Sequence, residues 1–144
     1  MIQEEHRQFL ETHSLCVVGF NRKQGPPSLS PTYYWLDGDE IVFSTTKVRG
    51  KGRAVARGED LSLCVLDTNP PFPYLLVYGK AGVDEAGAVD AMMRIGEIMT
   101  GNKLPEAARP VMEQRAHNEG RIAVRVAPYD FFKTTPIPTQ RPKS

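Results

Sequence analysis

The 144-residue sequence lacks long hydrophobic runs, and this absence argues against a membrane-spanning protein. No segment approaches the ~18 consecutive apolar residues that a membrane-spanning helix requires. The opening residues, MIQEEHRQFLETHS, are charged and contain no apolar run of the kind found in signal peptides. We therefore expect a cytoplasmic protein that makes no membrane contact.

The sequence also has little net charge and only two cysteines. Its 18 Lys and Arg residues nearly balance 17 Asp and Glu, which leaves a formal net charge of +1. This balance produces no overall field that would attract nucleic acid, so no nucleic-acid partner is expected. Cys16 and Cys64 fall in apolar, strand-like runs and are expected to stay reduced. The three histidines show no metal-ligand spacing, so no metal site is expected.

Short apolar and β-branched runs separated by turn residues dominate the chain. They predict six strands, at 15–21, 28–36, 41–45, 61–67, 74–83 and 121–132. Helices are predicted at 3–12 and at 52–57, the second ended by Gly58, and a helical pair follows Asp84, with glycines at 101 and 120 beyond its two ends. Strands joined by short turns favour one antiparallel barrel or sandwich domain over 1–132. The proline-rich tail, 133–144, is expected to be extended or disordered.

The feature that most needs an explanation is the basic run in FSTTKVRGKGRAVARGED, residues 43–60. Five cationic side chains lie between Lys47 and Arg57, with Gly50 and Gly52 among them. One interpretation is a solvated helix face, although like charges at i, i+4 repel and a helical glycine costs about 1 kcal/mol relative to alanine. The other is a phosphate site, because glycines at a strand-to-helix turn leave backbone N–H groups free to approach an anion.

Three short motifs occur in a set order: GP before the second predicted strand, FSTTKVRGKGR after the third and VYGKAGV in the fifth. Over residues 5–130 this succession resembles the split β-barrel flavin-binding superfamily, the pyridoxamine 5'-phosphate oxidase-like proteins. The resemblance implies a mainly β fold with helices, a six-stranded antiparallel split β-barrel that forms a homodimer. Four residues match the superfamily pattern after the third strand: Thr45, Lys51, Gly52 and Arg53. Gly50 replaces the arginine that would hold the flavin phosphate, and Arg49 replaces a serine.

That departure makes the segment Arg49–Arg53 more similar to the branch that uses the deazaflavin coenzyme F420. The resemblance implies a groove between two subunits in which the basic cluster holds the coenzyme's phosphate and glutamate tail. The cofactor-binding residues it implies are Arg49, Gly50, Lys51, Arg53, Ser44, Thr45, Thr46, Leu29, Ser30, Pro31, Thr32 and Tyr74. Of these, Tyr74 would contact the ring from the partner subunit. FMN is the alternative cofactor, since Thr45, Lys51 and Arg53 would serve it equally.

Three functions follow from these patterns. The first is a deazaflavin-dependent oxidoreductase that transfers a hydride to an unsaturated or carbonyl small-molecule substrate. The second is an FMN-binding oxidase or reductase of the same fold. The third is a non-catalytic protein that stores or carries the cofactor, because the sequence offers no catalytic triad or carboxylate pair and no catalytic residue can be named.

Overall fold

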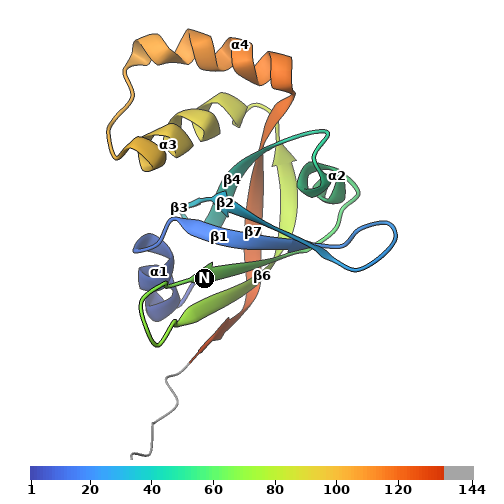
Figure 1. Ribbon diagram of the computed structural model, residues 1–144, viewed down its shortest axis with the longest axis vertical. Coiled ribbons are helices and arrows are strands. Elements are labelled where there is room, and N and C mark those ends of the chain that lie inside the picture. The colour runs from blue at the N-terminus through green and yellow to red at the C-terminus, as the bar shows by residue number, and fades with distance from the viewer. Residues whose placement is uncertain (135–144) are drawn as a thin grey trace, which may run out of the picture.

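The structure, a computed structural model, describes residues 1–134 as a curled β-sheet with helices at its ends and on one side (Figure 1). The strands are β1 (Leu15–Phe20), β2 (Ser28–Tyr33), β3 (Trp35–Asp37), β4 (Glu40–Thr46), β5 (Leu61–Leu66), β6 (Tyr74–Asp84) and β7 (Arg121–Lys133). The helices are α1 (Glu4–Glu11), α2 (Gly50–Ala56), α3 (Ala88–Thr100) and α4 (Arg109–Glu119), with a short 3₁₀ helix, η1 (Glu106–Ala108). Residues 135–144, most of the predicted tail, lie outside the described residues.

The sheet is antiparallel throughout and has the strand order β2-β1-β5-β6-β7-β4-β3. Its strands curl so that β2, at one end of this order, comes back into contact with β4 near the other end. Alternate side chains of each strand fill the interior, and Val18, Phe43, Leu63, Val77 and Val124 are almost completely buried there. The predicted mainly β split barrel is therefore confirmed.

The number of strands was predicted wrongly, because the segment 28–36 forms two strands instead of one. β2 pairs with β1, whereas β3 pairs with β4, so the chain changes partner at Tyr34. Tyr34 is buried and is held at this corner by two hydrogen bonds. Its N–H donates to the carbonyl of Ser14 at 2.9 Å, and its hydroxyl donates to the carbonyl of Leu10 at 2.8 Å. Within residues 1–134 the sheet consequently has seven strands.

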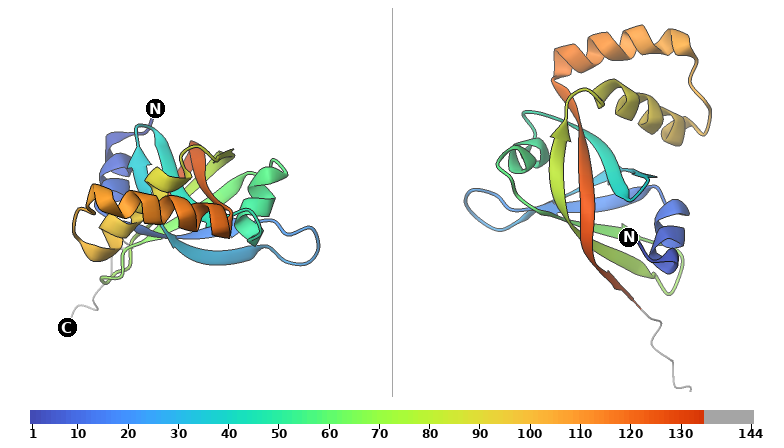
Figure 2. Two further views of the ribbon diagram at one scale, coloured as in Figure 1. Left: turned by 90° about the horizontal axis from the view of Figure 1, so that it is seen from above. Right: turned by 180° about the vertical axis from the view of Figure 1, so that it is seen from behind.

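α3 packs against the outer side of β4 and β7, and α4 packs on α3, farther from the sheet (Figure 2). Val42, Ala91 and Ala123 form a small second core beneath α3. The start of α3 is fixed by Asp84, whose carboxylate accepts a bond from the Gly87 N–H at 2.9 Å and pairs with Arg125 at 3.0 Å. These two interactions hold α3 against the sheet. Among residues 1–134, no helix combines the length and apolar character needed to cross a membrane.

The predicted second helix begins two residues earlier than expected, at Gly50 instead of Gly52. Its end is as the sequence indicated, because Gly58 adopts a left-handed conformation with a φ of 84°. The Gly58 N–H bonds the carbonyl of Val55 and the Glu59 N–H bonds that of Ala54, which is the Schellman arrangement. The earlier start matters for function, since it places Gly50 and Lys51 inside the helix.

Candidate functional site

Helical geometry divides the predicted basic cluster into two groups. Successive residues of an α-helix are rotated by about 100°, so residues two apart point in nearly opposite directions and residues four apart share a face. Arg53 and Arg57 accordingly lie on one exposed side of α2, whereas Arg49 precedes the helix in an extended conformation and is near enough for its charge to lower the pKa of Lys51. Lys51 lies on the opposite side, where only 7% of its surface is exposed. Lys51 and Arg53, two of the predicted phosphate ligands, therefore leave α2 in different directions.

The two glycines of the run have a packing role, which differs from the expected one. A side chain at Gly52 would overlap the backbone carbonyl of Thr46. A Cβ atom at Gly50 would lie 2.8 Å from the ring of Phe20. Both glycines thus allow α2 to sit directly on the barrel.

Lys51 carries its charge into the barrel without an opposing charge nearby. Its Nζ lies 5.9 Å from the centroid of the Phe43 ring. Burial, and secondarily the charge of Arg49, lowers the pKa of Lys51. Burial also raises the pKa of the neighbouring Cys16 thiol to about 12, so this thiol stays neutral and does not compensate the ammonium. Within residues 1–134, no side chain or carbonyl makes a hydrogen bond or an ion pair with Lys51.

A second unsatisfied polar group lies on β4. The hydroxyl of Thr45 is buried and has no hydrogen-bond partner among the described residues. Thr45 lies two residues after Phe43 on the same strand, so its side chain shares the interior face with the ring that Lys51 contacts. Buried polar groups normally find partners, because an unpaired one costs about 1–3 kcal/mol. An ammonium and a hydroxyl that both lack partners are suited to a bound anion.

The other two predicted site residues of β4, Ser44 and Thr46, face different parts of the structure. Ser44 points to the outer face of β4, where it pairs with Ala123 beside α3, and its buried hydroxyl also lacks a partner. The Thr46 hydroxyl accepts a bond from the Arg49 N–H at 3.3 Å, so it closes the turn into α2. The alternation of a strand therefore separates Ser44 from Thr45, although the sequence placed them in one groove.

The predicted residues of β2 are divided in the same way. Leu29 and Pro31 are exposed on the outer face of the sheet. Ser30 and Thr32 point inward, since Thr32 pairs with the buried Cys16. One strand thus contributes hydroxyl groups to the interior and apolar groups to the outside.

Tyr74 lies at the other end of the molecule from α2. It begins β6, and its N–H and carbonyl bond to Thr134. The end of β4, which leads into the basic run, lies at the opposite end of β7, where Ser44 pairs with Ala123. Ala123 and Thr134 are separated by 11 positions, a distance of up to ~36 Å along extended chain. Within one chain, Tyr74 is therefore far from the basic run.

A surface cleft of about 660 Å³ lies between α2 and the loop that joins β1 to β2. The same loop and helix lie on one side of the barrel in Figure 1. Five cationic side chains line the cleft, together with Phe20, Gln24, Gly50 and Ala56: Arg22, Lys23, Lys47, Arg53 and Arg57. Sequence reasoning assigned Arg22 and Lys23 to a turn only. The pair RKQG was the available signal, but only the fold places it opposite α2.

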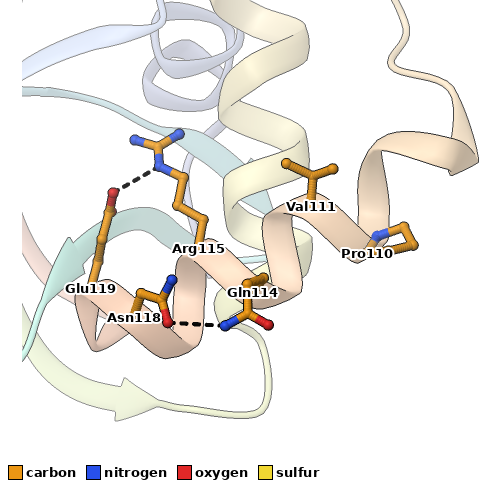
Figure 3. Close-up of a pocket in the computed structure, with 6 residues that line it drawn as sticks. All are labelled: Pro110, Val111, Gln114, Arg115, Asn118 and Glu119. Carbon is orange, nitrogen blue, oxygen red and sulfur yellow. Dashed lines mark hydrogen bonds and ion pairs between the residues drawn. The ribbon is translucent and has the colours of Figure 1, made fainter.

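A second hollow, of about 510 Å³, runs along the exposed side of α4 (Figure 3). Its lining comes from this one helix: Pro110, Val111, Gln114, Arg115, Asn118 and Glu119. The polar groups satisfy one another, since Arg115 pairs with Glu119 at 2.9 Å and Gln114 donates to Asn118 at 3.0 Å. This shallow surface gathers none of the predicted site residues, so the region around α2 is the candidate site.

Comparison with known proteins agrees with this fold. Residues 2–133 match the family model described as pyridoxamine 5'-phosphate oxidase. The conserved hypothetical protein Rv2991 from Mycobacterium tuberculosis superposes with a TM-score of 0.78 at 16% identity, covering 99% of this chain and 94% of that one. A structure described as an F420 reductase gives 0.71 at 20% identity, with 91% and 98% covered.

A further similar structure is a putative pyridoxamine 5'-phosphate oxidase from Listeria innocua, with a TM-score of 0.66 at 16% identity. The alignment with this structure covers 90% of the present chain and 95% of the Listeria chain. No match is found among proteins of curated function. At these identities, the similar structures establish the fold, and the family match spans nearly all described residues.

Proposed function

The chain belongs to the pyridoxamine 5'-phosphate oxidase family, and we propose that within this family it is an oxidoreductase that uses a phosphate-bearing deazaflavin of the coenzyme F420 type. The substrate class is an unsaturated or carbonyl small molecule that accepts a hydride. The observation that carries the proposal is the buried charge of Lys51, which makes no ion pair within residues 1–134 and follows Gly50, a residue that lines a cleft of further cations.

The residues present fit a phosphate group. Lys51 and Thr45 are donors without protein partners, and a phosphate supplies several acceptor oxygens. Arg53 lies on the cleft side of the same helix and can donate two parallel hydrogen bonds. An anion beside Lys51 would offset the cost of its buried charge, so binding and the burial of this lysine support each other.

When bound, the deazaflavin supplies the hydride chemistry, and the chain supplies position and environment. Lys51 and Arg53 would fix the phosphate end and so set where the ring lies. Ser30 and Thr32, whose side chains point inward from β2, would orient a polar group of the coenzyme.

FMN is the second candidate, because a single phosphate would satisfy Lys51 and Thr45 equally well. The residues around the site favour the deazaflavin. Gly50 stands where the superfamily pattern has the arginine that would hold the flavin phosphate. Arg22, Lys23 and Arg57 add charges in the cleft that a lone phosphate would not use. A cofactor with further anionic groups fits this arrangement better.

The proposal includes a homodimer that forms through the outer face of the sheet. Paired residues make one apolar row across five strands: Pro31, Val17, Cys64, Leu76 and Phe132. Leu29, Leu15 and Leu66 extend this row and are 71%, 49% and 45% exposed. Because Tyr74 lies far from α2 in its own chain, a second copy is also what would bring it to the site.

A turnover assay tests the proposed activity. Reduced coenzyme F420 is mixed with the protein and a quinone or enone acceptor, and the return of the oxidised coenzyme's visible absorbance is followed. We expect the protein to accelerate this oxidation, and the double variant Lys51→Met/Arg53→Gln to do so far less. Binding of the coenzyme without any acceleration for a panel of acceptors would instead identify a carrier.

A further inference from the structure

We propose that a cavity between α1, β3 and α3 is a second binding site, which takes a small α-amino acid with an aliphatic side chain. The last turn of α1, the corner between β2 and β3, and the second half of α3 all supply parts of its lining. These elements lie on the side of the barrel away from α2 (Figure 1). The cavity shares no lining residue with the cleft beside α2, so the inference does not depend on the proposed function.

Much of the cavity wall is apolar and fixed in place. Leu10 and Tyr34 are each only 1% exposed, and the Tyr34 hydroxyl donates to the Leu10 carbonyl at 2.8 Å. Trp35 and Ile98 are partly buried and line the same cavity. Trp35 also packs against the small core beneath α3, which fixes its position. An aliphatic side chain of a ligand would therefore meet a preformed apolar surface.

Two side chains of opposite charge also line the cavity, Glu11 from α1 and Arg94 from α3. They form no ion pair with each other. Within residues 1–134, each has one ion-pair partner on its own helix, Arg7 for Glu11 and Glu97 for Arg94, at 3.9 Å in both cases. Arg7 is further engaged by Asp39. A ligand that carries both charges could therefore join the two helices, with its ammonium at Glu11 and its carboxylate at Arg94.

The surroundings of Glu11 favour this orientation of the ligand. His13, the other titratable group of the lining on this side, is already occupied within the protein. Its Nδ1 lies 2.7 Å from the carbonyl of Phe9, and its Nε2 lies 3.2 Å from the carboxylate of Asp67. The last turn of α1 contains no basic residue, although the partial negative charge at a helix C-terminus attracts cations. An ammonium beside Glu11 would take this place.

The volume of the cavity, about 200 Å³, limits the size of the ligand. An apolar cavity of about 150 Å³ holds one benzene molecule. By this measure the cavity holds roughly eight or nine non-hydrogen atoms, the size of valine or leucine. A bulky cofactor does not fit there.

The test is the binding of L-leucine, measured by isothermal titration calorimetry beside two analogues that each lack one charge. The first, 4-methylpentanoate, lacks the ammonium, and the second, 3-methylbutylamine, lacks the carboxylate. We expect the wild type to bind leucine about fivefold more tightly than either analogue, the upper end of the contribution of a partly exposed ion pair. Leucine should also shift the backbone amide signals of residues 10–14, 34–36 and 94–98, and leave those of residues 50–57 unchanged.

Two variants assign the charges. Arg94→Gln should bind leucine and 3-methylbutylamine with equal affinity, and Glu11→Gln should bind leucine and 4-methylpentanoate with equal affinity. The controls Lys103→Gln and Glu113→Gln remove exposed charges outside the cavity and should keep the wild-type preference. A wild type that does not bind leucine, or that binds it no better than the analogues, would overturn the inference. So would a variant that retains the preference it is expected to lose.

Discussion

Lys51 and Arg53 lie two residues apart on α2, and their side chains leave the helix on opposite sides. Lys51 enters the barrel over the ring of Phe43, whereas Arg53 lines the surface cleft. A phosphate at the end of the barrel would be approached from within by one cation and from the cleft by the other. This division of roles leads to different expectations for the two residues.

Replacing Lys51 should stabilise the protein without ligand. Lys51→Met removes a buried charge that has no partner, and we expect the free energy of unfolding to rise by about 1 kcal/mol at neutral pH. Because the fold lowers the pKa of Lys51, the unfolded chain holds this proton more tightly. The stability of the wild type should therefore rise between the lowered pKa and the ordinary value of 10.5.

Urea unfolding over a pH series measures this effect. Lys51→Met should lose the alkaline rise, and Lys103→Met, at an exposed loop position, should keep it. A Lys51→Met protein that is less stable than wild type at neutral pH would show that its ammonium is satisfied in the fold.

Arg53 and Arg49 form a matched pair for testing the cleft. Both side chains are exposed, but only Arg53 lines the cleft. We expect Arg53→Gln to weaken cofactor binding by about 1.5–3 kcal/mol, the usual contribution of a charge-assisted hydrogen bond. Arg49→Gln should change the affinity less than a few fold. Equal losses in isothermal titration would indicate a general electrostatic attraction instead of a defined site.

Gly52 should be essential for the position of α2. In Gly52→Ala, the new methyl group would overlap the carbonyl of Thr46, and we expect a loss of about 1–3 kcal/mol of stability. Gly82→Ala is the control, because no atom lies within 4 Å of the added carbon there. Thermal unfolding of the two variants measures the difference. Similar melting temperatures would mean that α2 can shift away from the barrel at little cost.

The outer sheet face should control oligomeric state. Leu29→Asp places a charge in the proposed interface and should convert a dimer to a monomer at micromolar concentration. Val111→Asp on α4 is the control, since the two side chains have similar exposures of 71% and 68%. Sedimentation velocity distinguishes the species. A dimer that persists in Leu29→Asp, or a wild type that is monomeric, would contradict the proposed assembly.

The antiparallel strands and the helix ends were predictable from sequence because their signals are local or sequential, whereas the split-barrel arrangement was implied by the family resemblance. Each of these signals depends on the conformation of neighbouring backbone only. They are the alternating apolar residues, the Asp-Gly hairpin at 37–38 and the glycines at 58, 101 and 120. The division of 28–36 was missed, since it depends on Tyr34 bonding to Ser14 and Leu10, which are distant in sequence.

The site was less predictable for the same physical reason. The sequence identified the basic run, but its treatment as an open turn gave Arg49, Lys51 and Arg53 a common direction. The direction of Lys51 depends on where α2 begins. Because the helix starts at Gly50, two residues before the predicted start, Lys51 lies within it and turns inward. Arg22 and Lys23 were overlooked, since a turn reveals its function only when the fold shows what it faces.

The central claim is that the buried charge of Lys51 and the cleft beside it hold the phosphate end of a deazaflavin. The most direct measurement is a fluorescence titration of the wild-type protein with coenzyme F420 and, separately, with FMN. We predict tight binding of coenzyme F420 and binding of FMN at least about tenfold weaker, which corresponds to about 1.4 kcal/mol. Tighter binding of FMN, or no binding of coenzyme F420, would contradict the account.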